Sequence, residues 1–290
     1  MRLLLGVDAS PDSKSAAQMV KHLTPPPQLY VLHVVDIWSL KHAYLDSDHS
    51  DADFEAYRQE VSKRAEHVLH EIRHELSPHT QKIQLIADSG DPAESIIQTA
   101  EEVEADLIIL GHRGMTAKAP FLLGGVSQKV ATYAPCSVLI CKESVPVFDR
   151  VLLAVDGSEA SNKAVEFLAA CPFKQPLQAI ITTVWAPPPP SALESVPGEP
   201  ASSVEQSAAK DKGENLLNDL AARFETAPYE TQIDWRYGDP PSGILESAKQ
   251  HNVQMIVMGA RGLKGIKRFF LGSVSQKVLL HGACSVLIVR

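Results

Sequence analysis

The sequence repeats itself once, with an offset of 148 residues at both ends of the repeat. LLLGVDAS (3–10) aligns with VLLAVDGS (151–158), and each copy ends in the same segment, CSVLI. Because the offset is the same near both ends, the copies have no net insertion. The period is several times the roughly 20–50 residues of solenoid repeats, so each copy should be a complete domain. We therefore expect two domains, over residues 1–145 and 150–290.

Within each copy, short apolar runs alternate with stretches of helical periodicity. In the first copy, residues 30–37 and 107–110 are such apolar runs. Between them, Ala65, Leu69 and Ile72 recur at helical spacing and define one apolar face. Strands that are apolar without interruption are typical of a parallel sheet covered on both faces. We predict an α/β fold made of two repeated doubly wound five-stranded parallel-sheet domains.

Charge and cysteine content narrow the class of protein. The formal net charge is −8, whereas general binding to nucleic acid or an anionic membrane needs a basic surface. The chain has four cysteines but no C-x-x-C pair. Its first apolar run is too short for a signal peptide, and no run approaches the roughly 18 residues of a membrane helix. We expect a cytoplasmic protein with reduced thiols.

A glycine pattern follows the fourth predicted strand of each copy. MGARGLKGIKRFFLGSVSQKV (258–278) and LGHRGMTAKAPFLLGGVSQKV (110–130) both carry G-x-x-G-x9-G. Ligands of open α/β sheets bind at the carboxyl ends of the strands, where this pattern lies. Glycines there let the backbone approach a ligand closely. A helix that begins after the last glycine offers unpaired amides and the positive end of its dipole to an anion.

In the second copy, donors and positive charge gather at this helix start. The amides of residues 273–275, and the hydroxyls of Ser273 and Ser275, suit phosphate oxygens. Positive charge between the glycines comes from Lys264, Lys267 and Arg268. The spacing is neither a G-x-x-x-x-G-K-[ST] phosphate loop nor a G-x-G-x-x-G dinucleotide fingerprint. Two interpretations remain: a nucleotide-phosphate site, or glycines that only mark the end of one helix and the start of the next.

These motifs together resemble the universal stress protein family. They are G-x-x-G-x9-G-[ST], an opening V-D-x-S and a closing C-x-V-L-I, and the whole chain resembles the family's tandem type. The resemblance implies a five-stranded α/β fold related to the adenine-nucleotide alpha-hydrolases, with ATP as the ligand. It also implies that the last strands of the two domains pair, so that the chain is an internal pseudo-dimer.

The resemblance also assigns binding residues. It places the aspartate at the adenine or ribose end, the valine at the base, the first glycine by the ribose, and the last glycine with the helix start at the phosphates. In the second copy these cofactor-binding residues are Asp156, Val184, Met258, Gly259, Arg261, Gly262, Gly272, Ser273, Val274 and Ser275. In the first copy they are Asp8, Val34, Leu110, Gly111, Gly114, Gly124, Gly125, Val126 and Ser127.

The first copy departs from the pattern near the helix start. Gly125 stands in the place of Ser273 and lacks its hydroxyl. Uncharged residues, Ala119 and Pro120, replace Lys267 and Arg268 of the second copy. Because a hydrogen bond to a charged group contributes about 1.5–3 kcal/mol, we expect the second site to bind a nucleotide more tightly.

Two other features each have two interpretations. The Pro-rich segment 186–203 is either a lid over the glycine edge or a variable surface loop. His67, His70 and His74 share one face of a helix and form either a metal site or a solvated polar face.

The leading hypothesis is an ATP- or adenine-nucleotide-binding stress-response regulator. Its ligand would bias conformation or assembly, and a protein partner would read that state. The alternatives are a slow ATPase or nucleotidyl-transfer enzyme and a nucleotide-free interaction scaffold. We assign no catalytic residue and no metal ligand, although Asp8 and Asp156 are candidates for a Mg²⁺ accompanying ATP. The pseudo-dimer either stands alone or forms a further homodimer.

Overall fold

The structure is a computed structural model of the 290-residue chain. It describes all residues except 24–27, 38–40, 42–50, 81, 115–122, 143–146, 171–172, 175–176, 187–202, 225–228 and 263–270. Within the helices, the side chains of 51–53, 203–206 and 208 are also not described. The chain divides into two compact units, Met1–Ser144 and Val145–Arg290.

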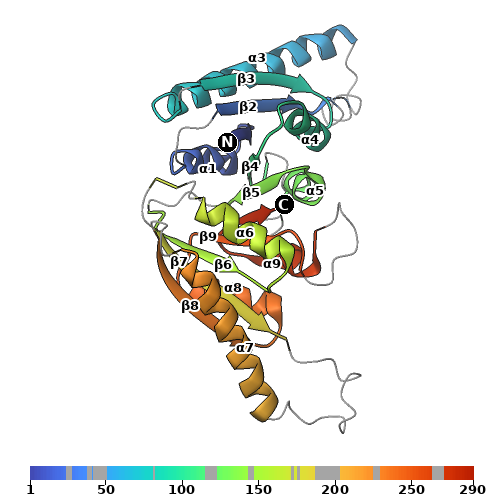
Figure 1. The fold of residues 1–290 in the computed structure, drawn as a ribbon. Coiled ribbons are helices and arrows are strands. Elements are labelled where there is room, and N and C mark those ends of the chain that lie inside the picture. The colour runs from blue at the N-terminus through green and yellow to red at the C-terminus, as the bar shows by residue number, and fades with distance from the viewer. Residues whose placement is uncertain are drawn as a thin grey trace. The chain divides into compact units, whose positions relative to one another are not determined.

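Each unit alternates strands and helices in the predicted order (Figure 1). The elements of unit 1 are β1 (Arg2–Gly6), α1 (Pro11–Val20), β2 (Gln28–Val35), α3 (Asp51–Leu76), β3 (Lys82–Ser89), α4 (Pro92–Glu102), β4 (Leu107–Gly111), α5 (Gly125–Tyr133) and β5 (Ser137–Cys141). Those of unit 2 are β6 (Arg150–Ala154), α6 (Glu159–Ala169), β7 (Leu177–Trp185), α7 (Ser203–Ala222), β8 (Tyr229–Tyr237), α8 (Pro240–Gln250), β9 (Met255–Gly259), α9 (Ser273–His281) and β10 (Ser285–Val289).

Both units contain a parallel sheet with helices on its two faces. The strand order is β3-β2-β1-β4-β5 in unit 1 and β8-β7-β6-β9-β10 in unit 2. In unit 1, α1 and α3 pack on one side while α4 and α5 pack together on the other. In unit 2, α8 and α9 pack together in the same way, α6 packs on β9 and β10, and α7 packs on β7 and β8. The predicted fold, two repeated doubly wound domains, is confirmed.

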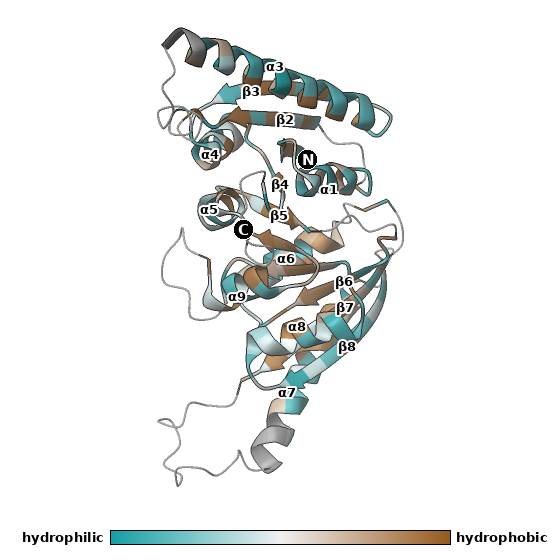
Figure 2. Cartoon of the chain, turned by 180° about the vertical axis from the view of Figure 1, so that it is seen from behind, coloured by the Kyte–Doolittle hydropathy of each residue, from teal (hydrophilic) through white to brown (hydrophobic). Residues whose placement is uncertain are grey.

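The core of each unit lies along the central strands. Residues of β1, β4, β6 and β9 are almost entirely buried, and Figure 2 shows the central strands in hydrophobic colours beneath largely hydrophilic outer helices. The edge strands β3 and β8 are only partly covered. On α3, the predicted apolar face is buried at Ala65, Leu69 and Ile72. Apolar burial of this kind contributes about 25 cal/mol per Å², so the sheet faces dominate the stability of each unit.

Strand register fixes which residues of the two units correspond. Gly6 pairs with Leu32 in unit 1, and Ala154 pairs with Thr182 in unit 2. The second strand of unit 2 is therefore displaced by two residues from the overall repeat, and Val34 corresponds to Val184. The third strands, β3 and β8, again correspond at the overall offset of the repeat. The pairing of these two valines in the sequence analysis is consistent with this register.

A strained turn after α4 gives a stability prediction. Glu104 has a φ of 48°, and its counterpart Asn252 has a φ of 51°. Asparagine tolerates this left-handed region, whereas glutamate does so at a cost. We expect Glu104→Asn to raise the free energy of unfolding by about 0.5–1 kcal/mol, measured by urea denaturation. Glu104→Gln, which removes the charge and keeps the strain, is the control, and an equal gain from it would contradict the backbone explanation.

Candidate functional site

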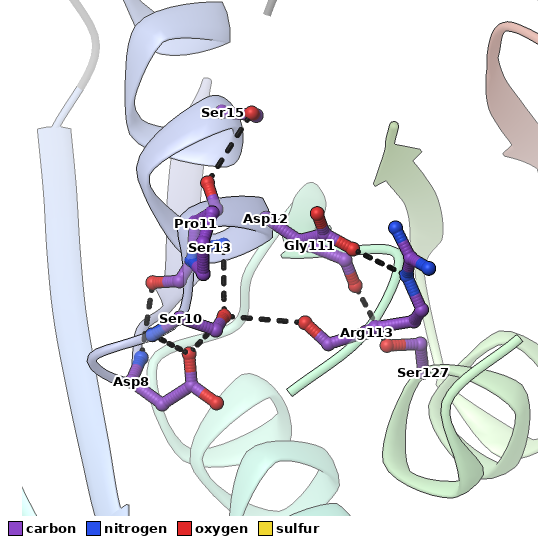
Figure 3. A network of polar contacts seen from close by, with 9 residues as sticks. All are labelled: Asp8, Ser10, Pro11, Asp12, Ser13, Ser15, Gly111, Arg113 and Ser127. Atoms are coloured by element: carbon purple, nitrogen blue, oxygen red, sulfur yellow. Dashed lines mark hydrogen bonds and ion pairs between the residues drawn. The ribbon is translucent and has the colours of Figure 1, made fainter. Parts of the chain in front are cut away.

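The candidate site of unit 1 lies where β1 and β4 end. Asp8 follows β1, and its Oδ1 accepts hydrogen bonds from the backbone N–H (2.9 Å) and the hydroxyl of Ser10. The backbone N–H of Asp8 donates to Ser13 Oγ at 3.0 Å. Ser10 also caps α1 by accepting from the N–H of Ser13 (Figure 3). The aspartate is thus held in a fixed orientation by the turn that begins the first helix.

The glycine loop is fastened to this turn. Ser10 Oγ lies 3.2 Å from the backbone oxygen of Arg113, and Arg113 Nε donates to Asp12 Oδ2 at 3.1 Å (Figure 3). A Cβ on Gly111 would lie 2.6 Å from the carbonyl carbon of Asp12. A glycine is therefore required at the end of β4 because the backbone of α1 passes directly over it.

Unit 2 repeats the turn with the same aspartate and serines, but with Ala160 in the place of Asp12. Asp156 Oδ1 accepts from the N–H of Ser158 at 3.0 Å, and the Ser158 hydroxyl lies 3.5 Å from the backbone oxygen of Arg261. A Cβ on Gly259 would lie 2.5 Å from the carbonyl carbon of Ala160 in α6. The close approach that we expected at this glycine toward a ligand is thus made toward the protein's own helix.

The second glycine of each motif faces the aspartate. A Cβ on Gly262 would lie 2.5 Å from Asp156 Oδ2, and one on Gly114 would lie 2.8 Å from Asp8 Oδ2. Both glycines are exposed. A larger residue at either position would push against the carboxylate end of the aspartate side chain, which would have to turn aside.

The helices after the glycine motifs begin without a side-chain cap. Gly124 and Gly272 occupy the N-cap positions of α5 and α9, and neither helix has a side-chain cap hydrogen bond. By contrast α1, α4, α6 and α8 are each capped by a serine or aspartate side chain. The first intrahelical bonds run from Gln128 to Gly124 (2.9 Å) and from Gln276 to Gly272 (2.8 Å). The N–H groups of Gly124 and Gly272 donate to the backbone oxygens of His112 and Ala260. Those of residues 125–127 and 273–275 have no acceptor among the described residues and are available to an external anion.

The two serines at the start of α9 have different roles. Ser275 is buried and donates its hydroxyl to the backbone oxygen of Gly259 at 2.9 Å; Ser127 donates likewise to Gly111 at 2.7 Å. The expectation that the Ser275 hydroxyl serves a phosphate is therefore wrong, because it fastens the helix to the strand. Ser273 is exposed, and a Cβ on its counterpart Gly125 would meet nothing within 4 Å.

The remaining predicted residues lie on the strands that lead to this edge. Leu110 and Met258 have buried side chains, so only their backbones border the edge. Val34 and Val184 are half-buried near the ends of β2 and β7. The Val184 side chain packs on α8, since a Cβ on Gly243 would lie 2.8 Å from its Cγ1. Val126 is exposed and Val274 half-buried in the first turns of α5 and α9.

Sequence reasoning missed two residues of unit 1, Asp12 and His112. His112 follows Gly111, is buried, and its Nε2 has no hydrogen-bond partner among the described residues. Burial, assisted by the positive charges of Lys142 and Arg113 and opposed by Asp12, lowers the pKa of His112 from 6.5 to about 4. The corresponding residues of unit 2 are both alanine, as a comparison of the two copies shows: Ala160 and Ala260.

Several predicted features lie outside the described residues. They include most of the Pro-rich segment (187–202) and five residues between the second and third glycines, namely Ala119, Pro120, Lys264, Lys267 and Arg268. His67, His70 and His74 are described and exposed, and His67 Nε2 lies 3.2 Å from Glu71 Oε1. The described residues contain no group of three or more side chains arranged to hold a metal ion. None of the described helices is both long and apolar enough to cross a membrane.

Comparison with known proteins places the chain in a family. Residues 1–142 and 148–290 each match the Universal stress protein family. Universal stress protein YxiE of Bacillus subtilis is 31% identical over 155 residues, which cover 50% of this chain and all of that protein. A universal stress protein from Archaeoglobus fulgidus shares the fold, with a TM-score of 0.67 and 24% identity over 100% of this chain and 98% of that one.

A third comparison is with another solved structure. A universal stress protein solved in complex with cAMP is 24% identical, covers 49% of this chain and 97% of its own, and has a TM-score of 0.36. Because the family match extends over both repeated units, the chain belongs to the universal stress protein family.

Proposed function

We propose that the protein binds an adenine nucleotide, ATP, with its phosphates at the start of α9 in unit 2. The observation that carries the proposal is the absence of a side-chain cap at α5 and α9, where the other capped helices of the two units use serine or aspartate. Backbone N–H groups at a helix start, together with the helix dipole, bind phosphate without further help.

The side chains around this helix start fit such a ligand. Ser273 is exposed in the first turn of α9 and can add a hydroxyl donor. Gly262 is exposed over Asp156, which has one oxygen bound to its own turn and the other facing that glycine. We propose Asp156 for the adenine or ribose end, and it is the candidate ligand for any Mg²⁺ that accompanies the nucleotide.

The proposed mode of action is regulatory. We propose that the two units pair through their last strands as an internal pseudo-dimer. ATP would stabilise one arrangement of the pair, and a partner protein would bind that arrangement. The direct test is to denature freshly purified protein and identify any released nucleotide by mass. A second test is thermal unfolding with added ATP, since a ligand at 100 times its Kd adds about 2.7 kcal/mol of stability. Protein that carries no nucleotide and is not stabilised by ATP would contradict the proposal.

Exchanging one residue between the units tests the role of the first helical turn. We expect Ser273→Gly to weaken ATP binding at α9 by about tenfold or more, because one hydrogen bond to a charged group is lost. Gly125→Ser should strengthen binding at α5, since open space surrounds that position. Amide hydrogen exchange of peptides from α5 and α9, followed during ATP titration of the full chain, reports each site separately. Equal ATP protection of α9 in wild type and Ser273→Gly would argue against a phosphate contact there.

A further inference from the structure

The carboxyl end of β7 in unit 2 stands beside the turn of the candidate site. β6 ends at Ala154, and the next residue, Val155, donates its N–H to the backbone oxygen of Thr182 at 2.9 Å. β7 continues beyond this point through residues 183–185, in register with β8. The ends of β7 and β8 therefore extend past the end of β6, next to the turn that carries Asp156.

Three aromatic side chains lie on one face of this extension. α7 packs on both strands (Figure 1), and a Cβ on its Gly213 would lie 3.5 Å from Thr183 Cγ2 and 2.4 Å from Trp235 Nε1. Side chains alternate along a strand, so Trp185 lies on the same face as Thr183. Tyr237 likewise shares the face of Trp235, and the centroids of these two rings are 6.3 Å apart. We call Trp185, Trp235 and Tyr237 the aromatic wall.

Unit 1 has the same extension without the aromatic side chains. The residues that correspond to the aromatic wall there are Val35, Ala87 and Ser89. The whole chain has only three tryptophans, and two of them belong to the aromatic wall. Trp235 Nε1 and Tyr237 Oη are buried and have no hydrogen-bond partner among the described residues. Unpaired buried donors are rare where side chains serve packing alone, so the aromatic wall is a candidate for a functional role.

Trp185 is the exposed member of the aromatic wall. Its exposed fraction is 38%, and the N–H of Gly238 donates to its backbone oxygen at 3.0 Å, which fixes its position at the end of β7. It directly follows Val184, the valine that the family pattern places at the base. α7 also borders the turn before α6, since a Cβ on Gly157 would lie 3.9 Å from Leu216 Cδ2. An exposed indole therefore lies on the side of the site where the base is expected.

We infer that Trp185 stacks on the adenine base of the nucleotide bound at unit 2. The inference rests on the proposed function, because it concerns the ligand of the same site. Stacking uses the π face of the base, whereas the start of α9 acts on the phosphates, so different parts of unit 2 hold the two ends of the ligand. Unit 1 lacks this contact because Val35 has no ring, which is a further reason for the second site to bind ATP more tightly.

The test compares ATP with inorganic tripolyphosphate, which carries the phosphates but no base. Amide hydrogen exchange of peptides from α9 is followed in the full chain during titration with each ligand. The variants are Trp185→Val, which reproduces the residue of unit 1, and Trp185→Phe, which keeps an aromatic face. The control is Ile233→Ala, which removes another exposed apolar side chain of unit 2.

The expected result is a loss of affinity that depends on the base. Trp185→Val should weaken ATP binding at α9 by about five- to a hundredfold, the range for losing one stack between a base and an aromatic side chain. Tripolyphosphate binding should be unchanged, Trp185→Phe should recover most of the ATP affinity, and Ile233→Ala should match the wild type. ATP should also quench the tryptophan fluorescence of the wild type, whereas tripolyphosphate should not, and this quenching should be largely lost in Trp185→Phe.

The outcomes separate this inference from the proposed function. If ATP protects α9 equally in wild type and Trp185→Val, the inference is wrong and the proposed function stands. If Trp185→Val weakens ATP and tripolyphosphate binding by the same factor, Trp185 acts through the fold rather than on the base, and the inference is again wrong. If ATP does not protect α9 in the wild type, both are wrong.

Discussion

Gly259→Ala is expected to lower the free energy of unfolding by about 3 kcal/mol, the upper part of the range for forcing atoms into a packed interior. The added Cβ would lie 2.5 Å from the carbonyl carbon and 2.6 Å from the carbonyl oxygen of Ala160. These are backbone atoms of α6, which cannot move aside by changing a rotamer. The helix must shift as a body, and with it the Ser158 cap that holds Asp156. The same substitution should therefore also weaken ATP binding at α9.

The chain contains a matched control for this experiment. Gly125 is also a glycine of the motif region, but a Cβ there meets nothing within 4 Å, and neither Gly125 nor Gly259 has a left-handed φ. Gly125→Ala should leave stability unchanged or slightly raised, because alanine favours the helical turn that glycine disfavours. Gly111→Ala, the counterpart of Gly259→Ala, should be as harmful, since its Cβ would lie 2.6 Å from Asp12. The three variants are compared by urea denaturation. Equal losses in the free energy of unfolding at all three positions would contradict the steric explanation.

The repeat, the fold class and the positions of the helix starts could be predicted from the sequence. Each depends on a local sequence pattern, such as the continuous apolar runs of β4 and β9 or the serine caps of α1 and α6. The repeat itself allowed Val34 and Val184 to be paired, because apolar runs align even where a two-residue displacement interrupts the offset.

Side-chain direction at the candidate site could not be predicted in the same way. Ser273 and Ser275 are two residues apart in one helical turn, so they point to different sides, and only the structure tells which one meets β9. The sequence suggested that Gly259 approaches a ligand, because the helix that it contacts, α6, is distant in sequence and could not be identified as its neighbour. Asp12 was missed because its ion pair with Arg113 joins residues distant in sequence, and His112 was missed because its burial cannot be inferred from the local sequence. A difference between the two copies was the available signal, at Ala160 and Ala260.

Acidification should destabilise the protein through His112. Its imidazole is buried and its pKa is lowered to about 4 in the folded protein, from 6.5 in the unfolded chain. Between these pH values the unfolded chain binds more protons than the folded one, so stability is complete above pH 6.5 and is lost as the pH falls toward 4. From pH 7 to pH 4.5 the loss from this one group is about 2–3 kcal/mol. His33, also partly buried with its pKa lowered chiefly by burial, acts in the same direction.

The effect of His112 can be separated from the protonation of carboxylates by a difference measurement. Urea denaturation of wild type and His112→Ala, which reproduces Ala260 of unit 2, is compared at pH 7 and pH 4.5. The variant loses packing at both pH values, but it lacks the group that must take up a proton on unfolding, so the wild type should lose about 2–3 kcal/mol more than the variant on acidification. His70→Ala, at an exposed position of α3, should keep the wild-type dependence. Parallel loss of stability in wild type and His112→Ala would show that the buried imidazole is not held neutral by its surroundings.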